Sequence, residues 1–182
     1  GGFMAEALAH KGARVSGIDP AQDAIQAAKH HAKASNLDIT YDVGVGEHMP
    51  YSDDTFNIVV CVDVLEHVRD LSQVLAEVAR VLKPGGLFLY DTINRNPIAR
   101  LATITVAEDI LRLLPKNTHD PAMFIKPLEL RTAMINAGLT VGPQTGLGPR
   151  GLNRQFDITF GPLPFKTVLY MGMARLPKVA PS

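Results

Sequence analysis

Three side chains that can do chemistry stand close together in the middle of the chain: Asp63, Glu66 and His67. They follow the apolar run from Phe56 to Cys61, which predicts a buried strand, and their i, i+3, i+4 spacing predicts one shared face of a following helix. Two carboxylates and an imidazole just beyond the carboxyl end of a strand can hold a cation or move a proton. A solvated helix start, where acids interact favourably with the helix dipole, is the non-functional interpretation.

Another carboxylate at the end of a predicted strand is Asp19, which follows the apolar stretch Ala13 to Ile18. At the end of a strand in an open α/β sheet, a carboxylate can accept hydrogen bonds from the two ribose hydroxyls of an adenosine. Capping of the helix expected to begin at Pro20 is the alternative. Gly46 and Glu47, after the next predicted strand, are expected beside the adenine, against the alternative of an ordinary loop.

The elements that must position these residues alternate between strand and helix patterns. This alternation predicts an α/β protein with a mostly parallel sheet and helices on both faces. A turn at Lys83 to Gly86 follows the helix that is expected to end near Leu82. The last two strands are joined by a Gly/Pro-rich stretch, so the sheet is expected to end antiparallel. We expect helices at 3–10, 21–34, 63–82 and 125–137, and strands at 13–18, 36–43, 56–61, 87–90, 139–145 and 166–175.

Composition limits the partners that the chain can have. The 182 residues predict one domain, and 18 basic against 18 acidic residues give a formal net charge of zero, so we expect no nucleic-acid partner. The single cysteine, Cys61, lies in an apolar strand and is interpreted as a core residue of a protein in a reducing compartment, which favours a cytoplasmic location. No apolar run reaches about 18 residues, the length a membrane-spanning helix needs.

Several short motifs together resemble the class I S-adenosylmethionine-dependent methyltransferases. Gly1 to Glu6 resembles the end of their glycine-rich cofactor loop, Gly17 to Asp19 their ribose-binding strand end, and Leu82 to Gly86 the turn before their fifth strand. More narrowly, five segments resemble the ubiquinone-biosynthesis O-methyltransferases within that family. These segments are 62–68, 92–95, 113–116, 118–120 and 124–127.

The resemblance implies a Rossmann-like methyltransferase domain over residues 1–182, with its first strand missing from this sequence and an inserted helical segment at about 94–124. The implied cofactor is S-adenosylmethionine, and the implied reaction is O-methylation of a polyprenylated catechol or phenol. Besides the missing first strand, the sequence departs from the family at two positions. Asp63 stands where the family usually has Glu, and Asn117 stands where it usually has Gly. The cofactor contacts expected from the resemblance are Gly1, Gly2, Asp19, Pro20, Gly46, Glu47 and Val62.

Two mechanisms remain open for the acceptor end of this site. In the first, Asp63, Glu66 and His67 ligate Mg²⁺ or another divalent cation, which lowers the pKa of the phenol. In the second, no metal takes part and His67 acts as general base, oriented by a carboxylate such as Glu66. His119 and Asp120 either close over the acceptor or stabilise a loop.

The segment from Arg95 to Lys116 mixes apolar and basic residues, a pattern typical of a helix at a membrane surface and equally of a helix that covers an active site. It suggests peripheral contact with anionic lipid at the inner membrane face, and the resemblance suggests other ubiquinone-biosynthesis enzymes as partners. Three other functions remain open. They are methylation of another small molecule, dinucleotide-dependent oxidoreduction, and noncatalytic binding of a nucleotide or lipid.

Overall fold

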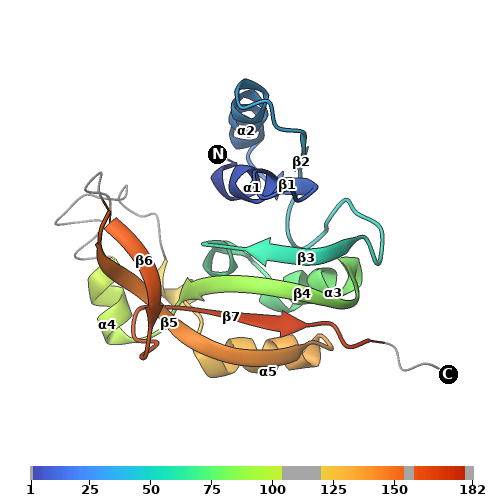
Figure 1. Cartoon of the computed structure of the whole chain (residues 1–182). Helices are drawn as coiled ribbons and strands as arrows, with labels where there is room; N and C mark the ends of the chain where they lie inside the picture. Colours follow the sequence, from blue (N-terminus) through green and yellow to red (C-terminus); the bar gives the residue numbers. More distant parts are fainter. Residues whose placement is uncertain (1, 104–119, 154–157, 179–182) are drawn as a thin grey trace. The chain divides into compact units, whose positions relative to one another are not determined.

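The computed structural model describes residues 2–103, 120–153 and 158–178. The chain divides into two compact units, Gly1–Tyr51 and Ser52–Ser182, and each is described by itself (Figure 1). The expectation of a single domain stays a prediction. Within the described residues, no helix is both long and apolar enough to cross a membrane.

The first unit is a small parallel sheet with two helices. Helix α1 (Phe3–Ala9) precedes β1 (Val15–Asp19), and helix α2 (Gln22–Ala34) connects β1 to β2 (Ile39–Val43). The two strands pair in parallel along their whole length, so that their carboxyl ends lie side by side at one edge. A core of apolar side chains joins α2 to β2, and it consists of Ile25, Ala28, Ala32 and Tyr41.

The N-terminal glycine pattern has a structural basis in this unit. Gly2 caps α1 with φ +86°, and a Cβ atom there would lie 2.7 Å from the Tyr41 hydroxyl oxygen. Both the left-handed backbone and the lack of space favour glycine at this position. Pro20, in contrast, precedes the N-cap Ala21 and is not the first helical residue of α2, so this detail of the prediction was wrong.

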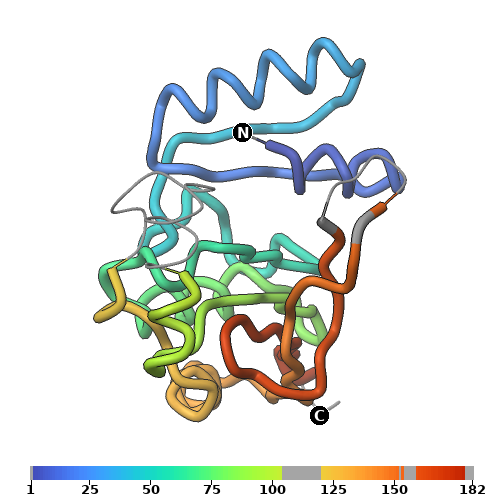
Figure 2. Tube along the Cα trace, turned by 90° about the vertical axis from the view of Figure 1, so that its left-hand side faces the viewer, coloured from blue at the N-terminus to red at the C-terminus, as the bar shows by residue number. Residues whose placement is uncertain are grey.

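The second unit is a five-stranded sheet with the strand order β3-β4-β7-β5-β6. Only β3 and β4 pair in parallel; β4 with β7, β7 with β5, and β5 with β6 are antiparallel. The predicted antiparallel end of the sheet is therefore confirmed, and the orange tube of β5 and the orange-red tube of β6 can be followed side by side in Figure 2. The strands are β3 (Phe56–Cys61), β4 (Leu82–Ile93), β5 (Thr140–Leu152), β6 (Ile158–Leu163) and β7 (Leu169–Arg175).

Helices α3 (Leu71–Val81) and α5 (Pro127–Asn136) pack against each other and against this sheet. In α3 the residues Val74, Leu75, Val78 and Val81 are at most 2% exposed, and their spacing places them on one helix face. Burial of each such side chain stabilises the fold by roughly 1.5 to 3 kcal/mol. The predicted boundary at Leu82 is confirmed to within one residue.

The helix predicted to begin at Asp63 begins later, and that prediction was wrong. Asp63 has a left-handed backbone with φ 52°, and only a short 3₁₀ turn, η1 (Leu65–His67), follows it. Helix α3 starts after Asp70, whose carboxylate accepts a hydrogen bond from the Gln73 N–H over 3.0 Å. Asp63, Glu66 and His67 therefore do not share a face of one α-helix.

Two further boundaries differ from the sequence-based expectation. Strand β4 begins at Leu82 rather than Leu87, because Gly85 with φ +83° lets the segment bulge and continue its pairing with β3. The Gly/Pro-rich stretch that was expected to be a connection contains β6 and the end of β5.

The expected inserted segment at about 94–124 is described only at its two ends. Helix α4 (Pro97–Arg100) lies at the start and the 3₁₀ turn η3 (Pro121–Met123) at the end, while His119 and most of the predicted interfacial segment lie outside the described residues. Asp120 accepts a hydrogen bond from the Ala122 N–H over 2.9 Å and so stabilises η3. This contact corresponds to the loop-stabilising interpretation of Asp120.

Candidate active site

The residues of the second unit that were predicted to take part in the reaction lie at the carboxyl edge of β3 and β4. Because these strands pair in parallel, with Cys61 opposite Tyr90, the residues that follow them come out at the same edge. Val62 and Asp63 follow β3, and Asp91 and Thr92 lie in the last part of β4. The Asp63 N–H donates to Asp91 Oδ1 over 2.8 Å, which fixes the two segments to each other.

Glu66 is the buried member of this group. Its side chain is 1% exposed, and its Oε2 accepts a hydrogen bond from the Thr92 hydroxyl over 2.7 Å. The second oxygen, Oε1, is buried and has no hydrogen-bond partner among the described residues. Because a buried polar atom without a partner is costly, this oxygen is a candidate acceptor for a ligand hydroxyl.

Asp91 adds a second carboxylate to the same edge. The side chain is 9% exposed, and burial raises its pKa from 3.8 to about 6, with the Asp63 and Glu66 carboxylates contributing and the bond from the Asp63 N–H opposing. Burial raises the pKa of the Cys61 thiol to about 12, and the negative charges of Glu66 and Asp91 contribute to this rise. The edge is therefore an acidic site that gains from a hydrogen-bond donor or a positive charge.

The predicted metal site is not assembled by the described residues. No three His, Cys, Asp or Glu side chains in 2–103, 120–153 and 158–178 are placed to hold a metal ion together. Asp63 and His67 are exposed, whereas Glu66 is buried and bound to Thr92. As placed, Asp63, Glu66 and His67 do not fit a divalent cation, so no chemical step is derived through one.

The first unit contains the predicted nucleotide-binding residues at the corresponding edge of its own sheet. Asp19 ends β1, and its neighbour Val43 ends β2, so Asp19 and the loop with Gly46 and Glu47 leave from adjacent strand ends. Asp19 Oδ1 accepts a hydrogen bond from the Ala21 N–H over 2.8 Å, which closes a turn just before α2, while the helix itself has Ala21 as its N-cap and no side-chain capping bond. A carboxylate has about four acceptor sites, so this bond leaves room for ligand hydroxyls.

The other predicted cofactor contacts are only partly placed. Gly2 and Pro20 lie at the starts of α1 and α2, and Val62 directly follows β3 in the second unit, whereas Gly1 lies outside the described residues. Their role in cofactor binding stays a prediction.

Sequence reasoning missed Asp91 and Thr92 as site residues. Asp91 carries the signal that identified Asp19, a carboxylate at the end of an apolar strand pattern. Thr92 enters the sequence-based argument through the family resemblance of segment 92–95, without a role in the site, and Asp91 does not enter it.

Comparison with known proteins places these features in context. Residues 1–90 match the model of a family described as a methyltransferase domain. A protein of Coxiella burnetii (strain RSA 331 / Henzerling II) named ubiquinone biosynthesis O-methyltransferase is 40% identical over 159 residues, which are 87% of this chain and 68% of that protein. A protein of the same name from Thiobacillus denitrificans (strain ATCC 25259 / T1) is 42% identical with the same coverage.

Solved structures agree with the fold. The crystal structure of an S-adenosylmethionine-dependent methyltransferase from Methanosarcina mazei superposes with a TM-score of 0.70 at 19% identity, covering 96% of this chain and 87% of that one. At this identity the likeness shows the fold, and it confirms the predicted Rossmann-like methyltransferase architecture.

Proposed function

Because this chain belongs to the family of the ubiquinone biosynthesis O-methyltransferases and is an S-adenosylmethionine-dependent methyltransferase, we propose that it methylates a phenolic oxygen of a polyprenylated catechol in ubiquinone biosynthesis. The observation that carries this proposal is the 40% identity over 87% of the chain to a relative of that name. The acidic edge of β3 and β4 supports it, because a phenolic acceptor brings a hydroxyl donor to Glu66 Oε1, which has no hydrogen-bond partner among the described residues.

The cofactor end of the proposed site is in the first unit. When bound, S-adenosylmethionine supplies a methyl group that is activated by a positively charged sulfur. Asp19 is proposed to accept hydrogen bonds from the ribose hydroxyls, and Gly46 and Glu47 to border the adenine. The fit is supported by Asp19, whose carboxylate lies at a strand end and retains acceptor sites beyond its bond to Ala21.

The acceptor end is proposed to work without a metal step. A phenol with a pKa near 10 is largely un-ionised at neutral pH, so the reacting oxygen needs a base. We assign this role to His67, whose imidazole nitrogen can accept a proton, and we assign to Glu66 Oε1 the acceptance of a hydrogen bond from the acceptor's hydroxyl. The proton of the reacting phenol then resides on His67, while Thr92 holds Glu66 in place.

Replacing Asp19 by asparagine is expected to weaken binding of S-adenosylhomocysteine about tenfold, because one of two ribose hydrogen bonds then meets an amide N–H instead of an acceptor. The asparagine oxygen can still accept from the Ala21 N–H, so α2 should start normally. Calorimetric titration of the variant measures the effect. The matched control is Asp38→Asn, an exposed carboxylate just before β2 at the opposite edge of the sheet. Equal affinity of the Asp19 variant and the unaltered protein would contradict the assignment.

The remaining functions are separated by three measurements. Turnover of water-soluble catechols as fast as polyprenylated ones would favour a methyltransferase with another small-molecule acceptor. No binding of S-adenosylhomocysteine would favour a noncatalytic protein that binds another nucleotide or a lipid. Preferential binding of a nicotinamide dinucleotide would favour an oxidoreductase.

We propose that the protein contacts anionic lipid at the inner membrane face, since a polyprenyl tail keeps the acceptor in a membrane. Ile98 and Leu101 are more than half exposed beside Arg95 and Arg100, which is the described part of the predicted interfacial segment. Replacing Ile98 by glutamate is expected to reduce sedimentation with phosphatidylglycerol vesicles about threefold or more, because a charge replaces exposed apolar area that the lipid would bury. Ile135→Glu, at an exposed position of α5, is the control. Equal sedimentation of the Ile98 variant and the unaltered protein would contradict this proposal. Contacts with other ubiquinone-biosynthesis enzymes stay a prediction.

A further inference from the structure

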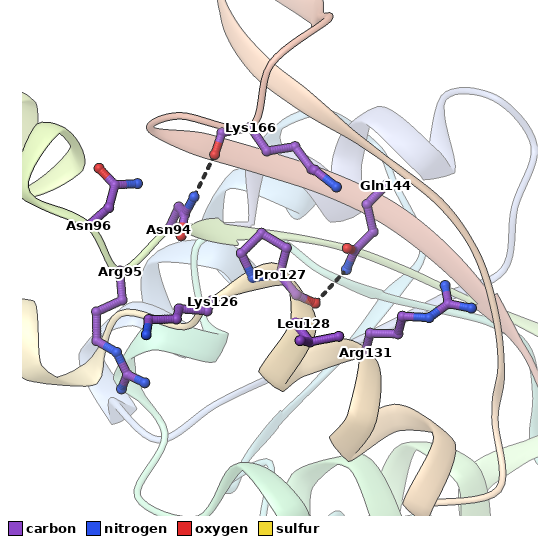
Figure 3. Close-up of a pocket in the computed structure, with 9 residues that line it drawn as sticks. All are labelled: Asn94, Arg95, Asn96, Lys126, Pro127, Leu128, Arg131, Gln144 and Lys166. Carbon is purple, nitrogen blue, oxygen red and sulfur yellow. Dashed lines mark hydrogen bonds between the residues drawn. The ribbon is translucent and has the colours of Figure 1, made fainter.

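A cavity of about 630 Å³ lies in the second unit, beyond the carboxyl end of β4. It is formed by the segment after β4, the start of α5, the middle of β5 and the residue Lys166 before β7 (Figure 3). None of Asp63, Glu66, His67 or Asp91 lines it, so the cavity is not explained by the acidic site.

The lining of this cavity is strongly positive. Four of its residues are cations, and no carboxylate residue is among those that line it. Arg95 forms an ion pair with Glu129, which lies outside the lining, whereas Lys126, Arg131 and Lys166 form no ion pair within the described part of the chain. The cations are Arg95, Lys126, Arg131 and Lys166.

Hydrogen bonds hold the cavity walls in place before any ligand arrives. The Asn94 side-chain amide donates to the Lys166 carbonyl over 2.6 Å, and the Asn96 amide donates to the Thr167 carbonyl over 2.7 Å. On the other side, the Gln144 amide donates to the Tyr90 hydroxyl over 3.1 Å. Figure 3 shows the Gln144 amide also directed at the Pro127 carbonyl, to which it donates over 3.4 Å. The cations therefore come from segments that are fastened to one another.

We propose that this cavity binds a phosphate group. Its cations come from three different segments, and a phosphate, with anionic oxygens distributed around one centre, can meet cations from several directions, whereas a carboxylate presents two oxygens on one side. The N-terminus of the ten-residue helix α5 lies at the cavity, but the Glu129 carboxylate caps it by accepting from the Lys126 N–H, so the positive charge of the cavity comes from its side chains.

The volume indicates that the phosphate is part of a larger molecule. Leu128 lines the cavity and is 72% exposed, and Phe165, next to Lys166, is 59% exposed, so apolar surface adjoins the positive lining. A phosphate ester with an apolar part matches both features. It can come from a soluble phosphorylated compound or from a phospholipid head group.

Calorimetric titration of the full chain with inorganic phosphate, at constant ionic strength in chloride, tests the proposal. We expect saturable binding to one site, weakened about fivefold or more by Lys166→Gln and separately by Arg131→Gln, since each removes a charge-assisted contact. Lys83→Gln, an exposed lysine near the opposite end of β4, is the matched control and should bind like the unaltered protein. Thermal melting checks that each variant is folded.

Two competition experiments identify the source of the phosphate. Displacement of inorganic phosphate by phosphatidylglycerol vesicles would assign a lipid head group, and displacement by glycerol phosphate alone would assign a soluble ester. Absence of saturable phosphate binding, equal binding of acetate, or equal losses in all three variants would overturn the proposal. These results do not depend on methyl transfer, because Lys166, Arg131 and Lys83 lie outside the acidic edge.

Discussion

Glu66→Gln is expected to lower kcat for methyl transfer at least about a hundredfold, the usual range for loss of a group that assists proton transfer. The glutamine keeps the shape of the side chain and an oxygen that can accept from the Thr92 hydroxyl. It removes the negative charge. It also puts an amide NH2 group, a donor, in the place of Glu66 Oε1, so a phenolic hydroxyl finds no acceptor there. Single-turnover measurement with saturating cofactor isolates this step.

The control for this prediction is another buried glutamate in the same unit. Glu77 is 7% exposed and accepts hydrogen bonds from Arg80, away from the carboxyl edge of β3 and β4. Glu77→Gln should lower thermal stability yet keep kcat within about twofold, because it removes a charged contact of structural origin only. Affinity for S-adenosylhomocysteine should be unchanged in the Glu66 variant. Full turnover by Glu66→Gln would refute the assigned role.

Asp91→Asn is expected to raise the free energy of unfolding at pH 8 by about 1 to 3 kcal/mol. The pKa of this carboxyl is about 6 in the folded chain, chiefly because of burial, against 3.8 for an ordinary aspartate. The folded protein thus binds the proton more tightly than the unfolded chain. Stability from this group is present below pH 3.8, falls as the pH rises toward 6, and stays low above 6.

Asparagine removes this pH dependence and still offers an oxygen to the Asp63 N–H. The gain should therefore vanish near pH 3.5, where Asp91 is protonated in both states, and this makes the low-pH measurement an internal control. Denaturant unfolding of both proteins at pH 3.5 and pH 8 gives the comparison. A gain of the same size at both pH values would show that the charge of Asp91 is not the cause.

Parts of the fold with a strong local signal were predictable from the sequence. The apolar run Phe56 to Cys61 is β3 with the same bounds, and α5 ends where Gly138 adopts φ +85°. These elements were correct because their apolar pattern and glycine stop signal agree with the final packing. Asp19 was placed at a strand end for the same reason.

Other parts depend on contacts that the sequence does not display. Both Asp63 and Asp70 could begin a helix. The helix begins after Asp70, because the Asp70 carboxylate accepts a hydrogen bond from the Gln73 N–H. Asp63 instead has a left-handed backbone conformation, and its N–H donates to the Asp91 carboxylate. That contact spans 28 positions in the chain, so local spacing could not reveal it. Strand β6 was missed because its pairing with β5 overrides the turn preference of Gly161 and Pro162.

The sole cysteine gives the second unit a natural reporter of its own opening. Cys61 ends β3, and burial together with the Glu66 and Asp91 carboxylates raises its thiol pKa to about 12, so its reactive thiolate is scarcer at neutral pH than that of an exposed cysteine. Alkylating reagents are therefore expected to react faster with molecules in which the surroundings of Cys61 have opened to solvent. The rate of modification at this one atom reads out how often the carboxyl edge of the sheet comes apart, and ligands that occupy the edge will slow it.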